Sequence, residues 1–175
     1  MMKSIVEEKL VSFKELEKKV FKYVCELGCE ITRILLETYD QELAATRNSK
    51  QYRDKGKRST CIKTVYGSVE YQRRVYKTSL EDGKTAYVYL LDKAMQMDKI
   101  GLISTNLAEK LAMTVTESPY RVTADIVSST CGQSISAGGV WNVMQRLGER
   151  ISKEEEHAVK QMNADQSEGQ KEIPV

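Results

Sequence analysis

The 175-residue sequence predicts an α+β protein that is mostly helical. Apolar residues recur every three or four positions in the first quarter of the chain and again after residue 92, which is the spacing of amphipathic helices. Between these regions the chain changes to the alternation that is typical of strands. We therefore expect a long N-terminal helix, a three-stranded antiparallel meander, and a helical unit that contains a helix-turn-helix.

The N-terminal segment, residues 1–46, is predicted to form one long helix or two nearly continuous ones over residues 4–46. A helix with a continuous apolar stripe needs a partner, either within the same chain or on a second copy. We therefore expect intramolecular packing or a homodimer through this helix. The stripe consists of Phe13, Leu16, Val20, Val24, Leu27, Ile31, Ile34 and Thr38.

The middle segment, residues 47–92, is predicted to be a basic connection over 47–58 followed by the meander. The pair Gly67-Ser68 suits a two-residue type II′ hairpin turn. That turn would place Tyr66 opposite Val69 and Ile62 opposite Arg73. A second turn at residues 81–83 precedes a third strand over 85–91, and one side of the meander needs a covering helix.

Positive charge is concentrated in this middle segment, although the formal net charge of the chain is only +2. Eleven basic and 4 acidic residues lie between Thr46 and Lys84, a local excess of +7. Local positive charge attracts a phosphate backbone, but a solvated lysine-rich loop explains the same pattern. If DNA binds here, the expected phosphate contacts are Lys55, Lys57, Arg58, Lys63, Arg73, Arg74 and Lys77.

Tyrosines accompany these cations on the predicted strands. The hairpin is expected to leave one basic face, with Tyr66, Tyr71 and Tyr76 nearby. Tyrosines between arginines suit nucleic acid, yet tyrosine is also a favoured strand residue. Both interpretations stay open at this point.

Residues 93–162 are predicted to form a helical domain. The first stretch with helical spacing runs from Asp92 to Glu117. Ile103, Leu107, Leu111 and Val115 follow one another at intervals of four. This stretch is long enough to supply the first member of a three-helix unit. From Asn163 the composition becomes polar, which predicts a linker over residues 163–175.

Residues 118–150 have the plan of a helix-turn-helix. Ser118 is expected to be an N-cap, Pro119 the first helical residue, and Gly132 the left-handed residue that ends the first helix. Ser136 is expected to cap the second helix. The apolar positions expected to face the core are Val122, Ile126 and Val127 in the first helix, and Val140, Val143, Met144, Leu147 and Ile151 in the second.

The opposite side of the second helix carries Trp141 and the polar residues Asn142, Gln145 and Arg146. In a helix-turn-helix the second helix enters the DNA major groove, so these three polar residues are expected to contact base edges. An ordinary helical hairpin, which binds no DNA, has the same periodicity. The remaining expected DNA contacts, at the start of the unit, are Arg121, Ser134 and Ser136.

Composition argues against several other classes of protein. No run of about 18 apolar residues is present to span a membrane, and the acidic N-terminus does not match a signal peptide, so we expect a cytoplasmic protein. Cys25 and Cys29 could hold two corners of a metal site, but zinc usually needs four ligands and two small buried hydrophobes explain them better. With a single histidine, His157, no nucleophile-and-base pair can be assembled. We expect no catalytic site and no metal in this chain.

Five strings run in order through most of the chain: YVCELGCE (Tyr23–Glu30), YRDKGKRSTCIKTVYGSVEYQRRVYK (Tyr52–Lys77), YVYLLD (Tyr87–Asp92), GLISTNLAEK (Gly101–Lys110) and GQSISAGGVWNVMQRLGE (Gly132–Glu149). Together they resemble the bacterial insertion-sequence transposases of the ISLre type, a family also filed as an uncharacterised protein family. Some related transposases carry paired cysteines near such a hairpin. Cys61 stands alone there, so a zinc-free sheet is expected.

The resemblance implies a cytoplasmic DNA-binding protein that cuts and joins the ends of its own element. Such enzymes resemble DDE transposases, in which a ribonuclease-H-like domain holds carboxylates around two magnesium ions. That domain would follow the linker, so we expect this chain to be the N-terminal, DNA-binding region that recognises transposon ends for DNA transposition. Magnesium is expected only in the domain that this chain lacks. The alternatives are an assembly module that oligomerises the transposase, or a truncated regulatory product.

Overall fold

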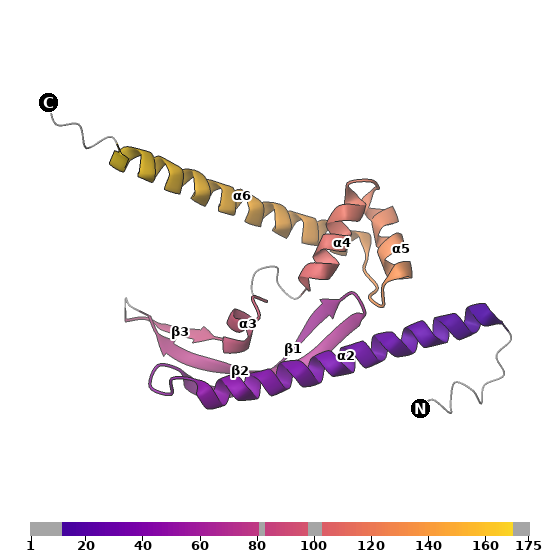
Figure 1. Ribbon diagram of the computed structural model, residues 1–175, viewed down its shortest axis with the longest axis horizontal. Helices are drawn as coiled ribbons and strands as arrows, with labels where there is room; N and C mark the ends of the chain where they lie inside the picture. Colours follow the sequence, from indigo (N-terminus) through magenta and orange to yellow (C-terminus); the bar gives the residue numbers. More distant parts are fainter. Residues whose placement is uncertain (1–11, 81–82, 98–102, 170–175) are drawn as a thin grey trace.

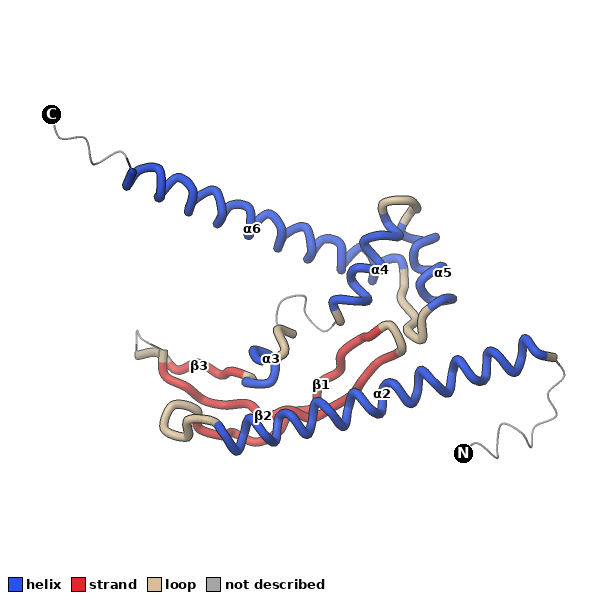
Figure 2. The backbone as a smooth tube through the Cα atoms, viewed as in Figure 1, coloured by secondary structure: helices blue, strands red, loops and turns tan. Residues whose placement is uncertain are grey.

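The computed structural model describes residues 12–80, 83–97 and 103–169, with side chains through residue 162. The fold is α+β and mostly helical, as predicted, with one three-stranded antiparallel sheet of order β1-β2-β3 (Figures 1 and 2). The elements are α2 (Phe13–Thr46), β1 (Arg53–Thr64), β2 (Gly67–Ser79), β3 (Thr85–Val88), α3 (Leu90–Ala94), α4 (Thr105–Val115), α5 (Tyr120–Thr130) and α6 (Ala137–Gly169).

The long N-terminal helix is confirmed as a single helix of 34 residues. Ser12 is its N-cap, because the hydroxyl oxygen accepts a 3.3 Å hydrogen bond from the backbone N–H of Glu15 and so pairs one of the free donors of the first turn. The predicted start of the helix at residues 4–11 lies outside the described residues.

Helix α2 lies beside the sheet and pairs with its open edge. Strand β3 pairs only with Tyr76–Ser79, so the first half of β2 would otherwise expose unpaired backbone N–H groups. Two carboxylates of α2 accept those donors: Glu37 from the N–H of Gln72 at 3.0 Å, and Asp40 from the N–H of Arg74 at 2.9 Å. The helix therefore replaces a missing neighbouring strand (Figure 1).

The hairpin turn lies two residues earlier than predicted, which moves the pairing register by four residues. Thr64 pairs with Gly67 and Ile62 with Val69, so the turn is Val65-Tyr66 rather than Gly67-Ser68. Gly67, the first residue after the turn, has φ +146°, and a Cβ at this position would lie 2.8 Å from the Cys29 sulfur. A glycine here therefore lets the backbone pass close to α2. Because the shift is an even number of residues, each side chain stays on the predicted face of the sheet.

Strand β1 begins earlier than predicted. Residues 53–58, expected to be part of a basic connection, pair with β2, and the ladder shifts at a β-bulge between Asp54 and Lys57. Gly56 takes φ +88° in this bulge and donates its N–H to the Asp54 carboxylate at 2.7 Å. The bulge lets the basic run form a strand, because it absorbs the extra residue.

The sheet has its own core, which α2 and α3 complete. The third strand is confirmed but ends at Val88, and the last two residues of the predicted strand, Leu90 and Leu91, begin α3 instead. Tertiary packing decides this, because Leu91 is fully buried on the sheet. The residues of this sheet core are Leu36, Ile62, Val69, Tyr71 and Leu91.

The helical unit α4–α5–α6 has a second core. The predicted stretch from Asp92 to Glu117 is not one helix: α3 ends at Ala94, residues 98–102 lie outside the described residues, and α4 begins at Thr105. The predicted apolar positions at intervals of four are nevertheless confirmed as core positions, since Ile103, Leu107, Leu111 and Val115 pack together. The core comprises Ile103, Leu107, Leu111, Ala124, Val127, Cys131 and Val140, with Val65, Val115, Ile135, Val143 and Met144 against it.

The start of α5 differs from the sequence prediction. Its N-cap is Pro119, without a side-chain cap bond, rather than Ser118. The Ser118 hydroxyl instead donates backward to the Thr114 carbonyl at 2.9 Å and lies 3.1 Å from the Thr123 hydroxyl. Val127 is buried as predicted, but Val122 and Ile126 are close to half exposed, because Thr123 and Ala124 occupy the core-facing side.

The end of α5 also has a different cause from the one predicted. Gly132 does not adopt the left-handed conformation, and the C-cap is Cys131 with φ −111°. The glycine is needed for close approach: a Cβ there would lie 2.6 Å from the carbonyl carbon of Tyr66 and 2.7 Å from the Cys25 sulfur. The hairpin tip therefore occupies the space that a side chain would fill.

Helix α6 begins as predicted and continues further than predicted. The Ser136 hydroxyl accepts from the backbone N–H of Gly139 at 3.1 Å, which confirms its capping role. The helix extends to Gly169, past Asn163, where the sequence predicts a linker. Its C-terminal part extends away from the rest of the molecule (Figures 1 and 2).

Candidate nucleic-acid interface

The first turns of α6 have one buried and one exposed face. Val140 is fully buried, and Val143 and Met144 pack against the helical core. Asn142, Gln145 and Arg146 are all exposed. Since these side chains are anchored from behind by core packing, they are presented to solvent on a fixed helix, which is the geometry that base-edge recognition needs.

The exposed face has a clear end along the helix. Leu147 is half-buried, but Ile151, predicted to face the core, is 47% exposed because α6 has left the helical core by that point. Glu149 is exposed one turn after Gln145, and a carboxylate there would repel phosphate. The exposed face without carboxylates is thus confined to the first three turns of α6.

The predicted contacts at the start of the unit lie on its surface. Arg121 is exposed on α5, and Ser134 is exposed in the connection to α6. Ser136 is exposed but its hydroxyl already caps α6. The connection itself is held by Ser128, whose hydroxyl accepts from the N–H of Ile135 at 3.0 Å.

The basic residues of β1 are also on the surface. Lys55, Lys57, Arg58 and Lys63 are exposed, and no described carboxylate lies within ion-pair distance of them. Lys77 on β2 is half-buried. Their charge is therefore available to an external anion rather than spent on internal pairs.

Arg73 and Arg74 were predicted to contact phosphates, but both form ion pairs within the protein. Arg74 lies 2.7 Å from the Asp40 carboxylate, which is 2% exposed, and 3.6 Å from that of Asp54. Arg73 pairs with the Asp92 carboxylate and stacks over the Tyr89 ring at 3.8 Å. Both guanidinium groups connect β2 to neighbouring elements, so we remove them from the set of expected DNA contacts.

The predicted tyrosine-bearing face is not open to solvent. Tyr71 is 3% exposed and Tyr76 is fully buried, while Tyr66 is half-buried at the hairpin tip. Burial raises the pKa of both the Tyr71 and Tyr76 hydroxyls above the ordinary tyrosine value. Of the two interpretations of these residues, packing within the sheet is the correct one for Tyr71 and Tyr76.

The exposed cations of β1 extend from the start of the strand to the hairpin tip. Lys55 and Arg58 are near the start of β1, whereas the hairpin tip at Val65 contacts the helical unit. At about 3.3 Å per strand residue, Lys55 and Val65 are roughly 30 Å apart along the strand. A ligand that touches both Lys55 and the hairpin end of β1 must therefore be long, as a DNA duplex is.

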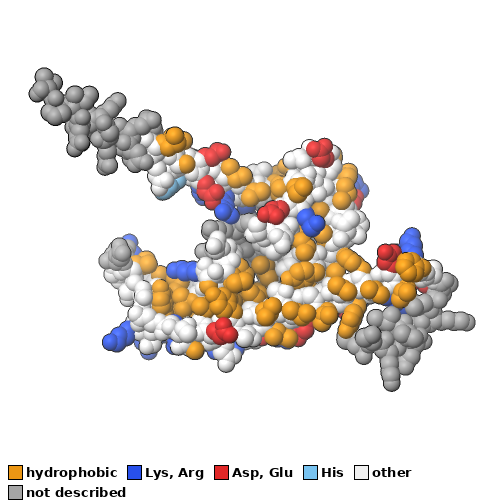
Figure 3. All heavy atoms as spheres, in the orientation of Figure 1, with side chains coloured by type: hydrophobic (Ala, Val, Ile, Leu, Met, Phe, Trp, Pro, Cys, Tyr) orange, Lys and Arg blue, Asp and Glu red, His pale blue; other side chains and the backbone are white. Residues whose placement is uncertain are grey.

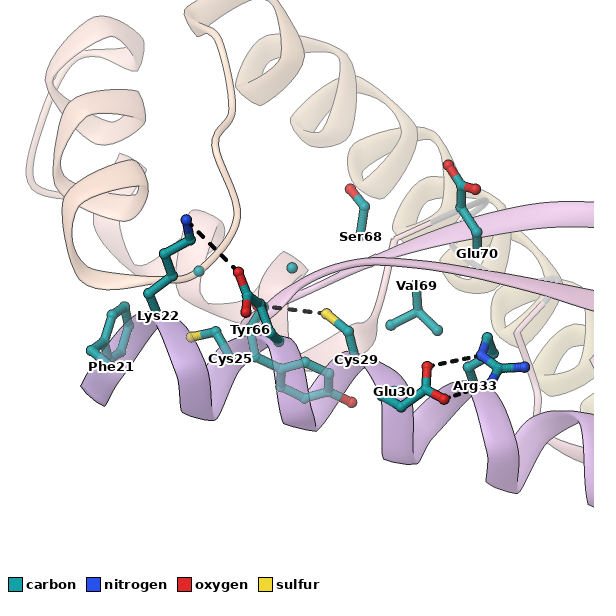
Figure 4. Close-up of a pocket in the computed structure, with 13 residues that line it drawn as sticks. Phe21, Lys22, Cys25, Cys29, Glu30, Arg33, Tyr66, Ser68, Val69 and Glu70 are labelled. Carbon is teal, nitrogen blue, oxygen red and sulfur yellow. Dashed lines mark hydrogen bonds and ion pairs between the residues drawn. The ribbon is translucent and has the colours of Figure 1, made fainter. Parts of the chain in front are cut away.

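A pocket of about 510 Å³ lies between α2 and the hairpin tip (Figure 4). Cys25, Cys29 and Tyr66 line it, and the Cys29 thiol lies 3.7 Å from the Tyr66 carbonyl oxygen. Burial raises the pKa of both the Cys25 and Cys29 thiols, so they stay protonated and poorly nucleophilic at neutral pH. We interpret the pocket as the open edge of the contact between α2 and the hairpin tip, rather than as a binding site.

The described residues contain no group of three or more His, Cys, Asp or Glu side chains that could hold a metal ion. Within the same residues, no helix is both long and apolar enough to cross a bilayer.

Sequence reasoning missed the residues that join the elements. Glu37 and Asp40 pair with the β2 edge, and the Gln133 amide oxygen accepts from the Ser68 hydroxyl at 2.8 Å. The only signal in the sequence was that Glu37, Asp40 and Arg33 lie on the side of α2 away from its apolar stripe. That side ordinarily indicates solvent.

These features define an α+β protein in which a helix-backed antiparallel meander is joined to a three-helix unit with an exposed polar helix face. The chain belongs to the Uncharacterised protein family (UPF0236), whose model matches residues 6–171. No curated protein and no solved structure was found to match it.

Proposed function

We propose that this chain is the DNA-binding N-terminal region of an ISLre-type transposase and that it recognises the ends of its own element. The observation that carries the proposal is the exposed polar face of α6, where Asn142, Gln145 and Arg146 lie opposite the buried Val140 on a helix that Ser136 caps. Asparagine and glutamine suit adenine, and arginine suits guanine, in the major groove.

The exposed cations of β1 support the proposal in a different way. Lys55, Lys57, Arg58 and Lys63 would contact phosphates, which add affinity and orientation but no sequence reading. One duplex that lies on the first turns of α6 and passes along β1 would use both groups. Arg121 and Ser134 would contact the backbone beside α6.

The test begins with selection of a preferred duplex from a pool with a random core, followed by binding measurements over a range of salt concentrations. Asn142→Ala and Gln145→Ala should each weaken binding to the selected duplex by about 1–3 kcal/mol and leave binding to a scrambled duplex unchanged. Lys57→Ala with Arg58→Ala should weaken binding to both duplexes and lower the salt slope by about 2.

Lys153→Ala is the matched control, because this lysine is exposed on α6 beyond Glu149. It should change neither affinity nor salt slope by a comparable amount. If the chain shows no preference for any selected duplex, or if Asn142→Ala weakens binding to every DNA equally, the groove assignment of α6 is wrong.

A further inference from the structure

We infer that α2 pairs with the α2 helix of a second copy of this chain, in antiparallel orientation, through an apolar face that the sheet leaves uncovered. This face is defined as Val20, Val24, Leu27, Ile31, Ile34 and Leu35, with Phe21 and Tyr39 at its margins. The inference concerns assembly and does not depend on DNA binding.

Helix α2 has apolar or buried residues on two nearly opposite sides. The sheet side contains Cys25, Leu36 and Asp40, which are buried. At about 100° per residue, the apolar face lies roughly 150° around the helix from these three. One long helix therefore packs on its own sheet and still presents an apolar face to the outside, where Figure 3 shows hydrophobic side chains along much of its length.

The size of this face matches half of a protein–protein interface. Its six central side chains are between 44% and 63% exposed. Full burial of a Val, Leu or Ile side chain corresponds to roughly 60–120 Å² of apolar area, so with the two marginal side chains the exposed apolar area is on the order of 400 Å². A standard interface takes about 800 Å² from each partner, polar rim included, and an apolar patch of a few hundred Å² is often a functional surface.

The spacing of the face is symmetric about its own centre, which is what an antiparallel pair requires. Around a midpoint at Cys29, Leu27 falls opposite Ile31 and Val24 opposite Ile34. The same symmetry places Val20 opposite Thr38. In a two-fold interface, each contact occurs twice, once in either direction, so the pairs Leu27–Ile31 and Val24–Ile34 form the apolar centre of the seam on both sides of the axis.

Charge along the helix selects the same orientation. Residues 13–22 carry four lysines and two glutamates, whereas residues 26–42 carry five acidic residues and one arginine. An antiparallel pair places the basic end of each helix beside the acidic end of the other. A parallel pair places like charges together and is disfavoured. The charge of α2 is therefore complementary to that of its own antiparallel copy, which makes a second copy of this chain the partner of this face.

Sedimentation of the 175-residue chain tests the assembly. We expect a species of twice the 19.9 kDa chain mass at micromolar concentrations. Leu27→Lys with Ile31→Lys should raise the dissociation constant by roughly 100-fold or more, because two charges enter the centre of the seam. Val159→Lys is the matched control: it charges an exposed apolar residue of α6 and should leave the dimer intact.

Cross-linking tests the orientation without relying on a disruptive variant. In an antiparallel pair, Val20 and its counterpart in the other copy are about 27 Å apart, since 18 residues rise about 1.5 Å each. Val20→Cys protein alone should therefore not cross-link, whereas a mixture of Val20→Cys and Thr38→Cys proteins should give the mixed disulfide. The chain with its native cysteines sets the background.

Three results would overturn the inference: a monomer at all concentrations, a dimer that survives Leu27→Lys with Ile31→Lys, or a disulfide formed by Val20→Cys alone. None of them bears on the proposed function, because binding of the selected duplex is measured separately. A monomeric double variant that still prefers the selected duplex would support both proposals.

Discussion

Single residues at the hairpin tip determine how closely the sheet and the helical unit approach each other. Gly132 donates its N–H to the Val65 carbonyl at 2.9 Å, with the Tyr66 backbone and the Cys25 sulfur where a side chain would begin. The neighbouring atoms are backbone or buried, so they cannot move aside at low cost. The absence of a Cβ at this one position permits the joint.

Gly132→Ala should therefore lower the free energy of unfolding by about 2–3 kcal/mol, measured by urea denaturation, because the new methyl group must displace the tip. Gly148→Ala is the matched control. A Cβ at position 148 meets no atom within 4 Å and lies within α6, so alanine there should be neutral or stabilise by up to about 1 kcal/mol. Equal effects of the two variants would contradict this account of Gly132.

Buried tyrosines should make stability fall at alkaline pH. Burial raises the pKa of Tyr71 and Tyr76 in the folded chain, so the unfolded chain loses these protons first. Their contribution is fully present below the unfolded tyrosine pKa of about 10 and is lost as pH rises through the higher folded values. Urea midpoints measured from neutral pH upward should decrease, and Tyr71→Phe should reduce the decrease. A midpoint that stays constant to about pH 11 would contradict the assignment.

At the scale of the elements, α2 stabilises the sheet through polar groups more than its sequence indicates. Its carboxylates accept from two N–H groups of the β2 edge, and Asp40 also pairs with the Arg74 guanidinium. Asp40 is 1% exposed, and a buried carboxylate costs several kcal/mol unless it is paired and hydrogen-bonded. The edge of the sheet and the ion pair thus depend on each other.

Arg74→Met should lower the free energy of unfolding by roughly 3 kcal/mol, because it leaves Asp40 buried without its cation. Arg58→Met is the matched variant on the adjacent strand. Arg58 is exposed, so its replacement should change stability by less than about 0.5 kcal/mol while weakening binding to every DNA. If Arg74→Met leaves stability unchanged, the pair with Asp40 contributes nothing to the fold.

Periodicity predicted the type of the long elements, and tertiary contacts decided the rest. The N-terminal helix, the meander and the cap at Ser136 follow from local spacing and turn chemistry. The buried side of α2 could not be predicted, because Asp40 and Glu37 have the composition of a solvated face. The hairpin turn lies two residues earlier than predicted because Tyr66 contacts α2, where its hydroxyl lies 2.6 Å from that of Thr32. No local signal reports such a contact.

In the candidate site, too, some residues could be predicted from local spacing and others depend on tertiary contacts. Exposure of Asn142, Gln145 and Arg146 agrees with the predicted helix face, since an amphipathic helix determines its outer side locally. Arg73 and Arg74 looked equivalent to the exposed cations of β1. Only the fold brings Asp92 and Asp40 to them, and sequence distance gives no indication of those pairs.

At the scale of the whole molecule, the hairpin tip joins two cores. Val65 packs on the helical core, whereas the adjacent Tyr66 packs on the sheet core. Three hydrogen bonds strengthen the joint: Gly132 N–H to the Val65 carbonyl, Ser104 N–H to the Lys63 carbonyl, and the Ser68 hydroxyl to Gln133. Because two adjacent turn residues belong to different cores, neither core can open without disturbing the tip.

Tyr66→Ala should therefore destabilise both cores together, by about 2–4 kcal/mol, because it removes a large side chain packed against Gly28 and Thr32. Native-state hydrogen exchange provides the measurement: amides of β2 and of α4 should lose protection by similar amounts. Tyr87→Ala is the matched control, since Tyr87 is 65% exposed on β3, and it should affect neither. Loss of protection in β2 alone would mean that the helical unit folds independently of the sheet. A duplex that touches both α6 and β1 would then join two separately folded parts rather than dock on one preformed surface.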